Sequence, residues 1–530
     1  MSTILEDKTA DAVAEIAHDS VLAAELVNEL AAAEGNLPVM ESMKIYAKAV
    51  FWSLFVSMGV IMVGYNSQII LSLFALPAFV NKYGTTTVDG TKTLTAGWQI
   101  ALSMCYIGEV IGALGIGWFY DRYGRKNTMI ACNIACIAAI FIIFFAPNAT
   151  VLTVGEVIAG IPWGGFTTIA PLYAAEVSPV ALRGMLTAFI NMAWIIGQLV
   201  GQGVTKATSN RMDEWGYRIP FAIQWAWCAV LAIGIPFAPE SPWYLVHKGR
   251  KAEAKKSLLR LVSANSPVNI DQQVEVIEKT DQLERSLQES STYMDLFRGV
   301  NLRRTEIANI AYCSQVLSGI PLSWYCNYFF TLAGLSTVQS FNLGVGNTAV
   351  GFVGTACTFF YLSYVGRRKA YVSGLTIMTT IMFVIAILDV LPHYGSHPSY
   401  SWAQSILLIV WSFFYQLTVG PLSYVYISEV PSTKLKGRSI ALSTAAFFFA
   451  MIVVSVALPY LFNPGAANLR GKVGFVFGGT SLATLIWAYF RLPETAGRKY
   501  AEIDYMFENK VPARHFAKYQ VAGISNAEEK

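Results

Sequence analysis

Long apolar stretches separated by short polar segments run through most of this chain. A helix needs about 20 predominantly apolar residues to cross a lipid bilayer. Twelve stretches meet this requirement, so the pattern predicts twelve transmembrane helices. Their expected cores are 48–72, 97–119, 127–146, 151–171, 184–207, 219–239, 306–332, 340–364, 369–391, 402–427, 438–461 and 472–491.

A polar segment over 240–305, rich in Lys, Glu, Ser and Gln, divides the spans into two groups of six. Part of it, 250–261, has the pattern of an amphipathic surface helix. We therefore expect an all-α polytopic membrane protein built from two six-helix repeats. The expected division is an N-terminal tail over 1–45, a first bundle over 46–239, a linker over 240–305, a second bundle over 306–491 and a C-terminal tail over 492–530.

The composition agrees with a chain that lies in lipid. Hydrophobic residues make up 54% of the 530 residues and charged residues only 14%, against roughly 25% charged in a soluble domain. So few charges would leave a large apolar surface in water, so the excess must face lipid. The small net charge of +4 gives no basis for nucleic-acid binding.

The sequence contains no motif that indicates catalysis, metal binding or nucleotide binding. The seven cysteines lie in apolar stretches without a Cys-x-x-Cys pair, which is typical of small buried hydrophobes. The five histidines fall in predicted tails and loops, and the chain has no Gly-x-x-x-x-Gly-Lys-Ser/Thr phosphate loop. We therefore expect no enzymatic activity, no cofactor and no metal site, and transport that is not driven by ATP.

Basic residues set the expected orientation, because loops on the cytoplasmic side carry an excess of Lys and Arg. The connections after spans 2, 4, 8 and 10, together with the linker, are the basic ones. They carry Arg122, Arg125, Lys126, Arg183, Arg367, Arg368, Lys369, Lys434, Lys436, Arg438, Lys248, Arg250, Lys251, Lys255 and Lys256. Both termini and the linker are therefore predicted to be cytoplasmic.

Charged motifs in the loops recur in the two halves at a nearly constant spacing. The Gly-Arg-Lys at 124–126 is echoed at 366–369, the segment 176–183 is echoed at 429–436, and Pro239-Glu240 is echoed at Pro493-Glu494. The repetition indicates a duplicated six-helix unit. Parallel six-helix repeats with a site between them are a transporter architecture.

These motifs resemble those of the sugar porter family of the major facilitator superfamily. The resemblance rests on Gly-x-x-x-Asp-Arg-x-Gly-Arg-Lys after span 2, Glu-Val-Ser-Pro-x-x-x-Arg-Gly at 176–184, Pro-Glu-Ser-Pro after span 6 and Pro-Glu-Thr-x-Gly-Arg after span 12. Strings such as Gly160-Ile-Pro-Trp-Gly164 and the segment 218–225 are similar to those of fungal α-glucoside (maltose-type) permeases.

The resemblance implies a plasma-membrane transporter that moves a disaccharide or a similar oligosaccharide by alternating access, in symport with protons. Its partners are then a small-molecule sugar, protons and the bilayer. Two alternatives stay open at this point: a facilitator that uses no proton, and a membrane sugar sensor with weak transport. The short C-terminal segment after Arg491 favours transport over sensing.

The loop motifs pair carboxylates with guanidinium or ammonium groups at the cytoplasmic ends of the spans. Such clusters could join the two halves while the transporter faces outward and break when it opens inward; the alternative is solvation of loop charges. The expected gate residues are Asp121, Arg122, Arg125, Glu176, Arg183, Glu240, Arg367, Arg368, Glu429, Lys436 and Glu494. Ser363 replaces the usual acid of the second copy, so that cluster is expected to be weaker.

A polar stripe in span 5 is the candidate sugar site of the first half. Asn191, Trp194, Gln198 and Gln202 follow at steps of about one helical turn, so they share one face. Amides that face lipid are costly, so a stripe of them predicts a cavity, although helix–helix hydrogen bonding explains single amides. By resemblance, Gln202 is the sugar-binding glutamine of this span.

Span 7 carries the second half of the expected site. By resemblance, Gln315 is retained from the family pattern Gln-Gln-Leu-Ser-Gly-Ile-Asn, whereas Val316 and Pro321 replace two of its polar groups. Trp324 and Tyr325 follow and could close over a sugar. In span 10, Tyr424 takes the place of the family's tryptophan.

Two acids inside the predicted spans, Glu109 and Glu156, are the candidates for proton coupling. The resemblance implies a Glu-Gly-Tyr-Asp string in span 1, but this chain has Val63-Gly-Tyr-Asn66 and so lacks both acids. Glu156 starts a helical face with Gly160 and Trp163, so we expect it to look into the cavity. The alternative is that both glutamates stay protonated and only hydrogen-bond a neighbour.

Overall fold

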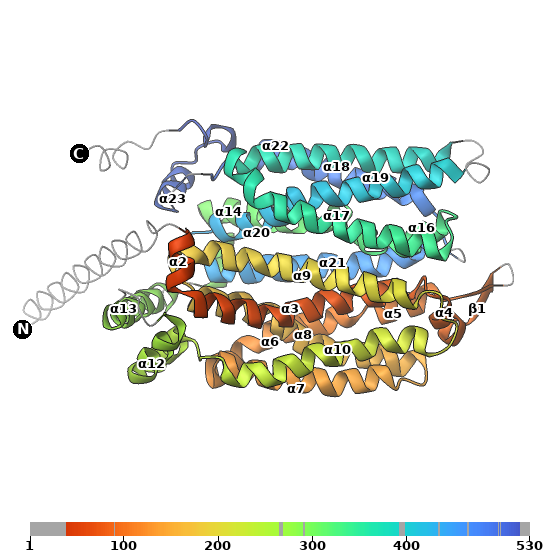
Figure 1. Cartoon of the computed structure of the whole chain (residues 1–530). Coiled ribbons are helices and arrows are strands. Elements are labelled where there is room, and N and C mark those ends of the chain that lie inside the picture. Colours follow the sequence, from red (N-terminus) through yellow and green to blue (C-terminus); the bar gives the residue numbers. More distant parts are fainter. Residues whose placement is uncertain are drawn as a thin grey trace, which may run out of the picture.

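The computed structural model describes residues 39–88, 91–263, 269–289, 292–391, 398–432, 435–463, 466–496, 498 and 500–519. The tail segments 1–38 and 520–530 lie outside these residues. Nearly all of the described chain is helical, and long helices run side by side along one direction (Figure 1). The helices α12 (Lys251–Leu261), α13 (Ile270–Glu289) and α23 (Tyr500–Glu508) gather at one end, which we call the linker end. The strand β1 (Thr86–Val88) and the helix α16 (Cys326–Leu332) lie at the opposite end, which we call the hairpin end.

Six spans form the first half, and their bounds agree with the apolar stretches of the sequence. A short helix, α2 (Val39–Ile45), precedes them, and α4 (Pro77–Tyr83) and a hairpin of β1 (Thr86–Val88) with β2 (Thr91–Thr93) follow the first span. The spans are α3 (Ala47–Leu73), α5 (Ala96–Leu102) with α6 (Cys105–Tyr123), α7 (Arg125–Phe144), α8 (Ala149–Val177), α9 (Val180–Thr208) and α10 (Trp215–Gly234) with the short η1 (Ile235–Phe237).

The linker and the second half follow. The linker contains α11 (Pro242–His247), α12 (Lys251–Leu261), α13 (Ile270–Glu289) and η2 (Tyr293–Phe297). The spans are α14 (Gly299–Leu317) with α15 (Ile320–Trp324) and α16 (Cys326–Leu332), α17 (Thr337–Tyr364), α18 (Arg367–Val390), α19 (Pro398–Leu417) with α20 (Val419–Glu429), α21 (Lys436–Phe462) and, after η5 (Arg470–Lys472), α22 (Val473–Arg491). The last described elements are α23 (Tyr500–Glu508) and η6 (Ala513–His515).

The prediction of twelve spans is confirmed by this arrangement. Within the described residues, ten helical segments are long and apolar enough to cross a membrane by hydropathy alone. The two remaining spans are α9, whose apolar run is interrupted by three amides, and the run α14–α16, which begins with charged residues and is broken twice. Both spans carry residues of the candidate sugar site predicted from the sequence.

The break between α14 and α15 has a local cause. Gly319 has a φ of 112°, a conformation in which a residue with a Cβ is strained, and Pro321 follows in the first turn of α15, where its missing N–H is harmless. The chain continues beyond the break in α15 and α16, and α16 contacts α3 and α9 of the first half.

Small residues let the helices of the first half approach closely. A Cβ on Gly112 of α6 would lie 1.9 Å from the carbonyl oxygen of Ile161 in α8, and one on Gly64 of α3 would lie 2.2 Å from that of Trp194 in α9. Lipid gives no hydrophobic force between helices, so close backbone packing of this kind stabilises the bundle.

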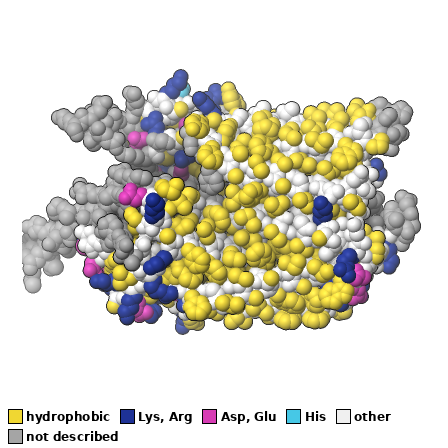
Figure 2. Space-filling model, in the orientation of Figure 1, with side chains coloured by type: hydrophobic (Ala, Val, Ile, Leu, Met, Phe, Trp, Pro, Cys, Tyr) yellow, Lys and Arg dark blue, Asp and Glu magenta, His cyan; other side chains and the backbone are white. Residues whose placement is uncertain are grey.

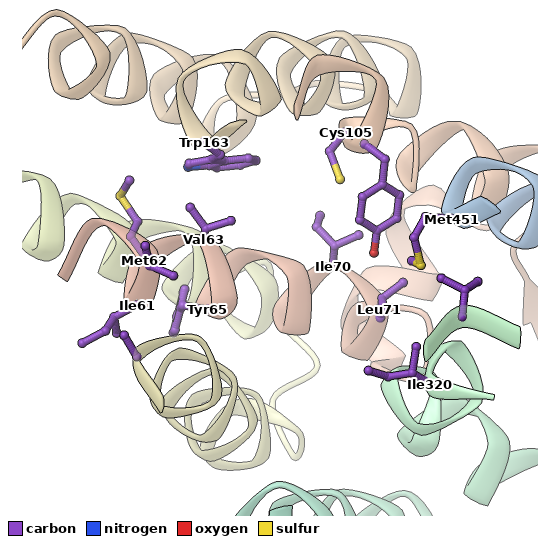
Figure 3. Packing of buried hydrophobic residues seen from close by; sticks show 14 of the residues in the cluster. Ile61, Met62, Val63, Tyr65, Ile70, Leu71, Cys105, Trp163, Ile320 and Met451 are labelled. Carbon is purple, nitrogen blue, oxygen red and sulfur yellow. The ribbon is translucent and has the colours of Figure 1, made fainter. Parts of the chain in front are cut away.

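Apolar side chains fill the interior of both halves and cover the outside. In Figure 3, Met62 and Val63 of α3 point toward Trp163 of α8, while Ile320 and Met451 of the second half belong to the same buried cluster. Figure 2 shows a broad hydrophobic band between the two ends, with charged side chains gathered mainly at the ends. This band is the surface expected to face lipid.

The C-terminal segment, expected as a tail, is packed through residue 519. Arg304 at the start of α14 forms an ion pair with Asp504 of α23, and its guanidinium lies 4.6 Å from the ring centre of Phe507. Phe507 and Phe516 are fully buried. The segment therefore covers the linker end of the second half.

Candidate functional site

A small cavity lies between the two halves. It has a volume of about 20 Å³, which holds about one water molecule, so its walls must separate to admit anything larger. Side chains from both halves line it: Gln68, Ile195 and Gln198 from the first, and Ile320, Ser323, Trp324, Asn347, Thr348, Gly351, Ser412, Tyr415 and Gln416 from the second.

Amides from four different helices face this cavity. Gln68 comes from α3, Gln198 from α9, Asn347 from α17 and Gln416 from α19. Asn347 Nδ2 donates to Ser323 Oγ at 3.0 Å, and the Oε1 of Gln416 accepts from the hydroxyl of Thr355 at 3.2 Å. Donors and acceptors that converge in this way suit a ligand with many hydroxyl groups.

Aromatic rings form a second part of the wall. Tyr415 stacks on Trp411 with ring centres 5.4 Å apart and planes 5° from parallel. The Tyr415 hydroxyl donates to the Oε1 of Gln315 at 2.8 Å, and this bond fixes the ring against the cavity. The indole of Trp324 adds a further aromatic face.

The predicted stripe of span 5 is divided by the structure. Gln198 lines the cavity, whereas Gln202 is fully buried and bonded to α16. Trp194 presents its backbone carbonyl to Gly64 of α3, and its ring packs against the core cluster. Asn191, two turns from Gln198 toward the linker end, is half-buried and is not part of the cavity wall.

The predicted residues of spans 7 and 10 are placed at different depths. Trp324 lines the cavity, and Gln315 lies behind Tyr415 rather than at the wall. The Tyr325 hydroxyl lies 3.1 Å from that of Ser103, across the boundary between the halves. Tyr424 is half-exposed, with its ring edge-on to Tyr312 at 5.3 Å, and does not line this cavity.

The two candidate acids lie inside the first half. Glu109 and Glu156 are 2% and 0% exposed. The Oε2 of Glu156 accepts from Asn66 Nδ2 at 3.3 Å, and Asn66 Oδ1 accepts from Gln224 Nε2 at 2.8 Å. Glu156 thus bonds to α3 and is not among the residues that line the cavity described above. Gly160, one turn further along α8, packs closely on α6. The role of Glu156 in proton coupling stays a prediction.

The charged residues after span 2 form a compact cluster at the linker end. Arg125 binds Glu176 through two bonds, at 2.8 and 3.1 Å, and lies 3.6 Å from Asp121. Glu240 accepts from the backbone N–H of Arg125 at 3.0 Å. Burial raises the pKa of the Glu240 carboxyl, and the surrounding N–H groups oppose that shift. The guanidinium of Arg122 instead lies over the ring of Trp118.

The second half repeats this cluster. Arg367 forms an ion pair with Glu429 and donates to the carbonyl oxygen of Thr495 at 3.0 Å. Glu494 accepts from the backbone N–H of Arg368 at 3.2 Å. Lys436 begins α21. The side chain of Arg183 lies outside the described ones. Among the described contacts, each cluster joins helices of its own half, so the role of a latch between halves stays a prediction.

Hydrogen bonds between the halves, among the described residues, lie toward the hairpin end. Gln99 Nε2 donates to the Tyr328 hydroxyl at 3.4 Å, and Asn463 Nδ2 donates to the carbonyl oxygen of Leu94 at 2.7 Å. Asn327 Nδ2 donates to Gln202 at 2.9 Å. In this structure the hairpin end is thus the closed end of the cavity.

Several site residues have no counterpart among the predicted ones. They are Gln68, Ser323, Asn327, Asn347, Ser412, Tyr415 and Gln416. The only signal in the sequence was a polar residue inside an otherwise apolar span, and many such residues occur. Which of them face a common cavity depends on how the two halves meet.

Two six-helix halves that enclose a polar cavity define a membrane transporter of the major facilitator type. The comparisons agree. The chain belongs to the "Sugar (and other) transporter" family, whose model matches residues 52–507. A general alpha-glucoside permease of Saccharomyces cerevisiae is 36% identical over 497 residues, which covers 92% of this chain and 80% of the permease. A maltose permease of the same yeast is 37% identical over 496 residues, with the same coverage.

Solved structures share the fold. A xylose transporter from E. coli in a partially occluded inward open conformation superposes with a TM-score of 0.68 at 18% identity, and covers 85% of this chain and 99% of the transporter. A structure of a proton:xylose symporter gives a TM-score of 0.67 at 20% identity, over 87% of this chain and 100% of that one.

Proposed function

We propose that this protein transports α-glucoside sugars, disaccharides or similar oligosaccharides, by alternating access and in symport with protons. The relatives named above support the substrate class. The observation that carries the proposal is the cavity at the boundary of the halves, because amides, hydroxyls and aromatic rings from both halves converge on it. Sugars are bound by such groups, and a site shared by two rocking halves can be opened to either side in turn.

Their place at the cavity wall supports a direct role for Gln198 and Trp324 in binding. The bond from Tyr415 supports a role for Gln315 as a positioning residue behind that ring. Asn191, Trp194 and Tyr424 do not line the small cavity described above. In this proposal they line the path on the linker side and meet the sugar when that side is open.

We propose a plasma-membrane protein whose termini and linker are cytoplasmic. The basic loops support this, because they lie at the linker end together with α12, α13 and α23. The hairpin end then faces outside, and the structure corresponds to an outward-closed state. The functional units are the bundles 46–239 and 306–491, the linker 240–305, and the terminal segments 1–45 and 492–530.

Coupling to protons is assigned to Glu109 and Glu156. Acids inside a membrane bundle are rare and mark ion or proton pathways. Glu156 is bonded to Asn66 of α3, and α3 in turn packs on α9, which carries Gln198. A change in the protonation of Glu156 therefore acts on the helix next to the cavity.

The charged clusters at the linker end are proposed to form the cytoplasmic gate. Each holds its own half rigid through Arg125 or Arg367 in this structure. When the linker side closes, the two clusters approach each other and charges of one pair with charges of the other across the boundary. Breaking those pairs reopens the inner side.

Uptake of a panel of radiolabelled sugars tests the proposal. Cells that lack other sugar permeases would express the full chain, and maltose, sucrose, glucose and xylose would be supplied with and without a protonophore. We expect saturable uptake of α-glucosides that rises above the outside concentration and collapses with the protonophore. Uptake that never exceeds equilibrium would support a facilitator, and a properly located protein without uptake would support a sensor.

A further inference from the structure

Asn327 lies where helices of both halves meet at the closed end of the cavity. Its Nδ2 donates to Gln202 Oε1 of α9 at 2.9 Å and to Ser72 Oγ at the end of α3 at 3.0 Å. It is 1% exposed and belongs to α16, so one side chain joins two helices of the first half to the second.

Both polar atoms of the Gln202 amide are bonded to α16 in this state. Its Oε1 accepts from Asn327, and its Nε2 donates to the Sγ of Cys326 at 3.7 Å. Gln202 is 0% exposed, so its amide is shielded from solvent in this state. Gln198, one turn away on α9, remains at the cavity wall.

We propose that Asn327 is a gate residue that competes with the sugar for Gln202. In the closed state Gln202 is bonded to Asn327. When the hairpin end opens, α16 moves away from α9 and the Gln202 amide turns to the sugar. The sugar that enters from outside thus replaces Asn327, and its departure to the inside returns Gln202 to Asn327. The proposal rests on the proposed function for the nature of the ligand, but the gate itself needs no sugar.

Gly344 of α17 is a second and independent part of this arrangement. A Cβ there would lie 1.9 Å from Asn327 Oδ1 and 3.0 Å from Gln202 Oε1. The Asn327–Gln202 pair therefore fits against α17 only because residue 344 has no side chain. Gly346 on the same helix is a matched control, because the nearest atom to its Cβ would be in Ile409 at 4.0 Å.

Cys326 supplies a native reporter of the gate. It is fully buried beside Gln202 and Asn327, and opening of the hairpin end exposes it to the outer solution. A membrane-impermeant maleimide applied to intact cells, without sugar, measures its labelling rate. The Cys326→Ser variant gives the background from the other cysteines.

Asn327→Leu removes the bonds of Asn327 to Gln202 and to Ser72 in the closed state, so the open fraction increases. Hydrogen bonds between membrane helices are worth about 0.6 kcal/mol each on average, so the loss of two should speed the labelling of Cys326 about eightfold. Gly344→Ala should have the same effect, and Gly346→Ala should label at the parent rate. If Asn327→Leu fails to reach the surface, the comparison of Gly344→Ala with Gly346→Ala tests the gate by itself.

The exchange also predicts opposite effects on affinity. Asn327→Leu should lower the half-saturation for external sugar, whereas Gln202→Leu should raise it, although both should speed Cys326 labelling. Parent-rate labelling of both Asn327→Leu and Gly344→Ala overturns the gate, even if uptake works normally. If Cys326 is labelled faster in these variants but the protein transports none of the panel sugars, the Asn327 gate is supported and only the proposed substrate is rejected.

Discussion

Removing the phenolic hydroxyl of Tyr415 tests how the second half holds its part of the site. The Tyr415→Phe substitution keeps the ring, its stacking on Trp411 and its place at the cavity wall. It deletes only the bond of 2.8 Å to the Oε1 of Gln315. Gln315 is 3% exposed and keeps its other bond, from Nε2 to the carbonyl oxygen of Tyr312.

The size of the effect follows from this geometry. An unpaired buried acceptor costs about 1–3 kcal/mol in soluble proteins, but pairs in membrane helices average about 0.6 and reach about 1.7 kcal/mol. We use the membrane range, because Gln315 lies inside a span. The half-saturation for sugar uptake should therefore rise about threefold to twentyfold, with surface abundance unchanged.

A double-mutant cycle with Gln315→Leu identifies the path of the effect. Gln315 lies behind Tyr415, so each single substitution removes the same interaction and the double variant should be no worse than the poorer single one. Half-saturation constants would be measured from initial uptake rates on intact cells for the parent protein, the two single variants and the double variant. Additive losses would refute this reasoning, because they would mean that Gln315 contacts the sugar directly.

Three further predictions follow from other parts of the molecule. Gly112→Ala should lower the free energy of unfolding of the detergent-purified protein by about 1–3 kcal/mol. Gly115→Ala, whose added Cβ meets no atom within 4 Å, should leave that free energy unchanged or higher. Equal melting curves for the two variants would contradict the helix packing. Cysteines introduced at Gly249 and Thr87 should be labelled from opposite sides of the membrane, and labelling from one side would overturn the topology. Arg125→Lys should reduce the rate of uptake with little change in half-saturation, because lysine lacks the two-pronged contact with its carboxylate; an unchanged maximal rate would argue against a gating role.

The spans could be predicted from the sequence because the apolar runs have the length that a bilayer requires. Even α9, with its three amides, was predicted from its predominantly apolar composition over 184–207. The break between α14 and α15 depends on Gly319 and Pro321, which local sequence also reveals. The fold therefore required little tertiary information.

The site was predicted less completely. Helical spacing groups residues on one face, but it does not say which neighbour that face meets. Gln198 reached the cavity as expected, whereas Glu156 faces α3 and bonds Asn66 instead. Asn327 and Tyr415 had no polar stripe around them, and their roles arise only where helices from distant parts of the chain cross.

Proton-driven accumulation is the central claim, and purified protein in sealed proteoliposomes tests it most directly. With maltose equal on both sides and an imposed gradient that is acidic at the hairpin face, the account predicts that radiolabelled maltose rises inside above its outside concentration, and that a protonophore abolishes the rise. Glu109→Gln and Glu156→Gln should exchange maltose but not concentrate it. Accumulation by both variants would contradict the assigned acids, and equilibration without accumulation by the unaltered protein would contradict symport itself.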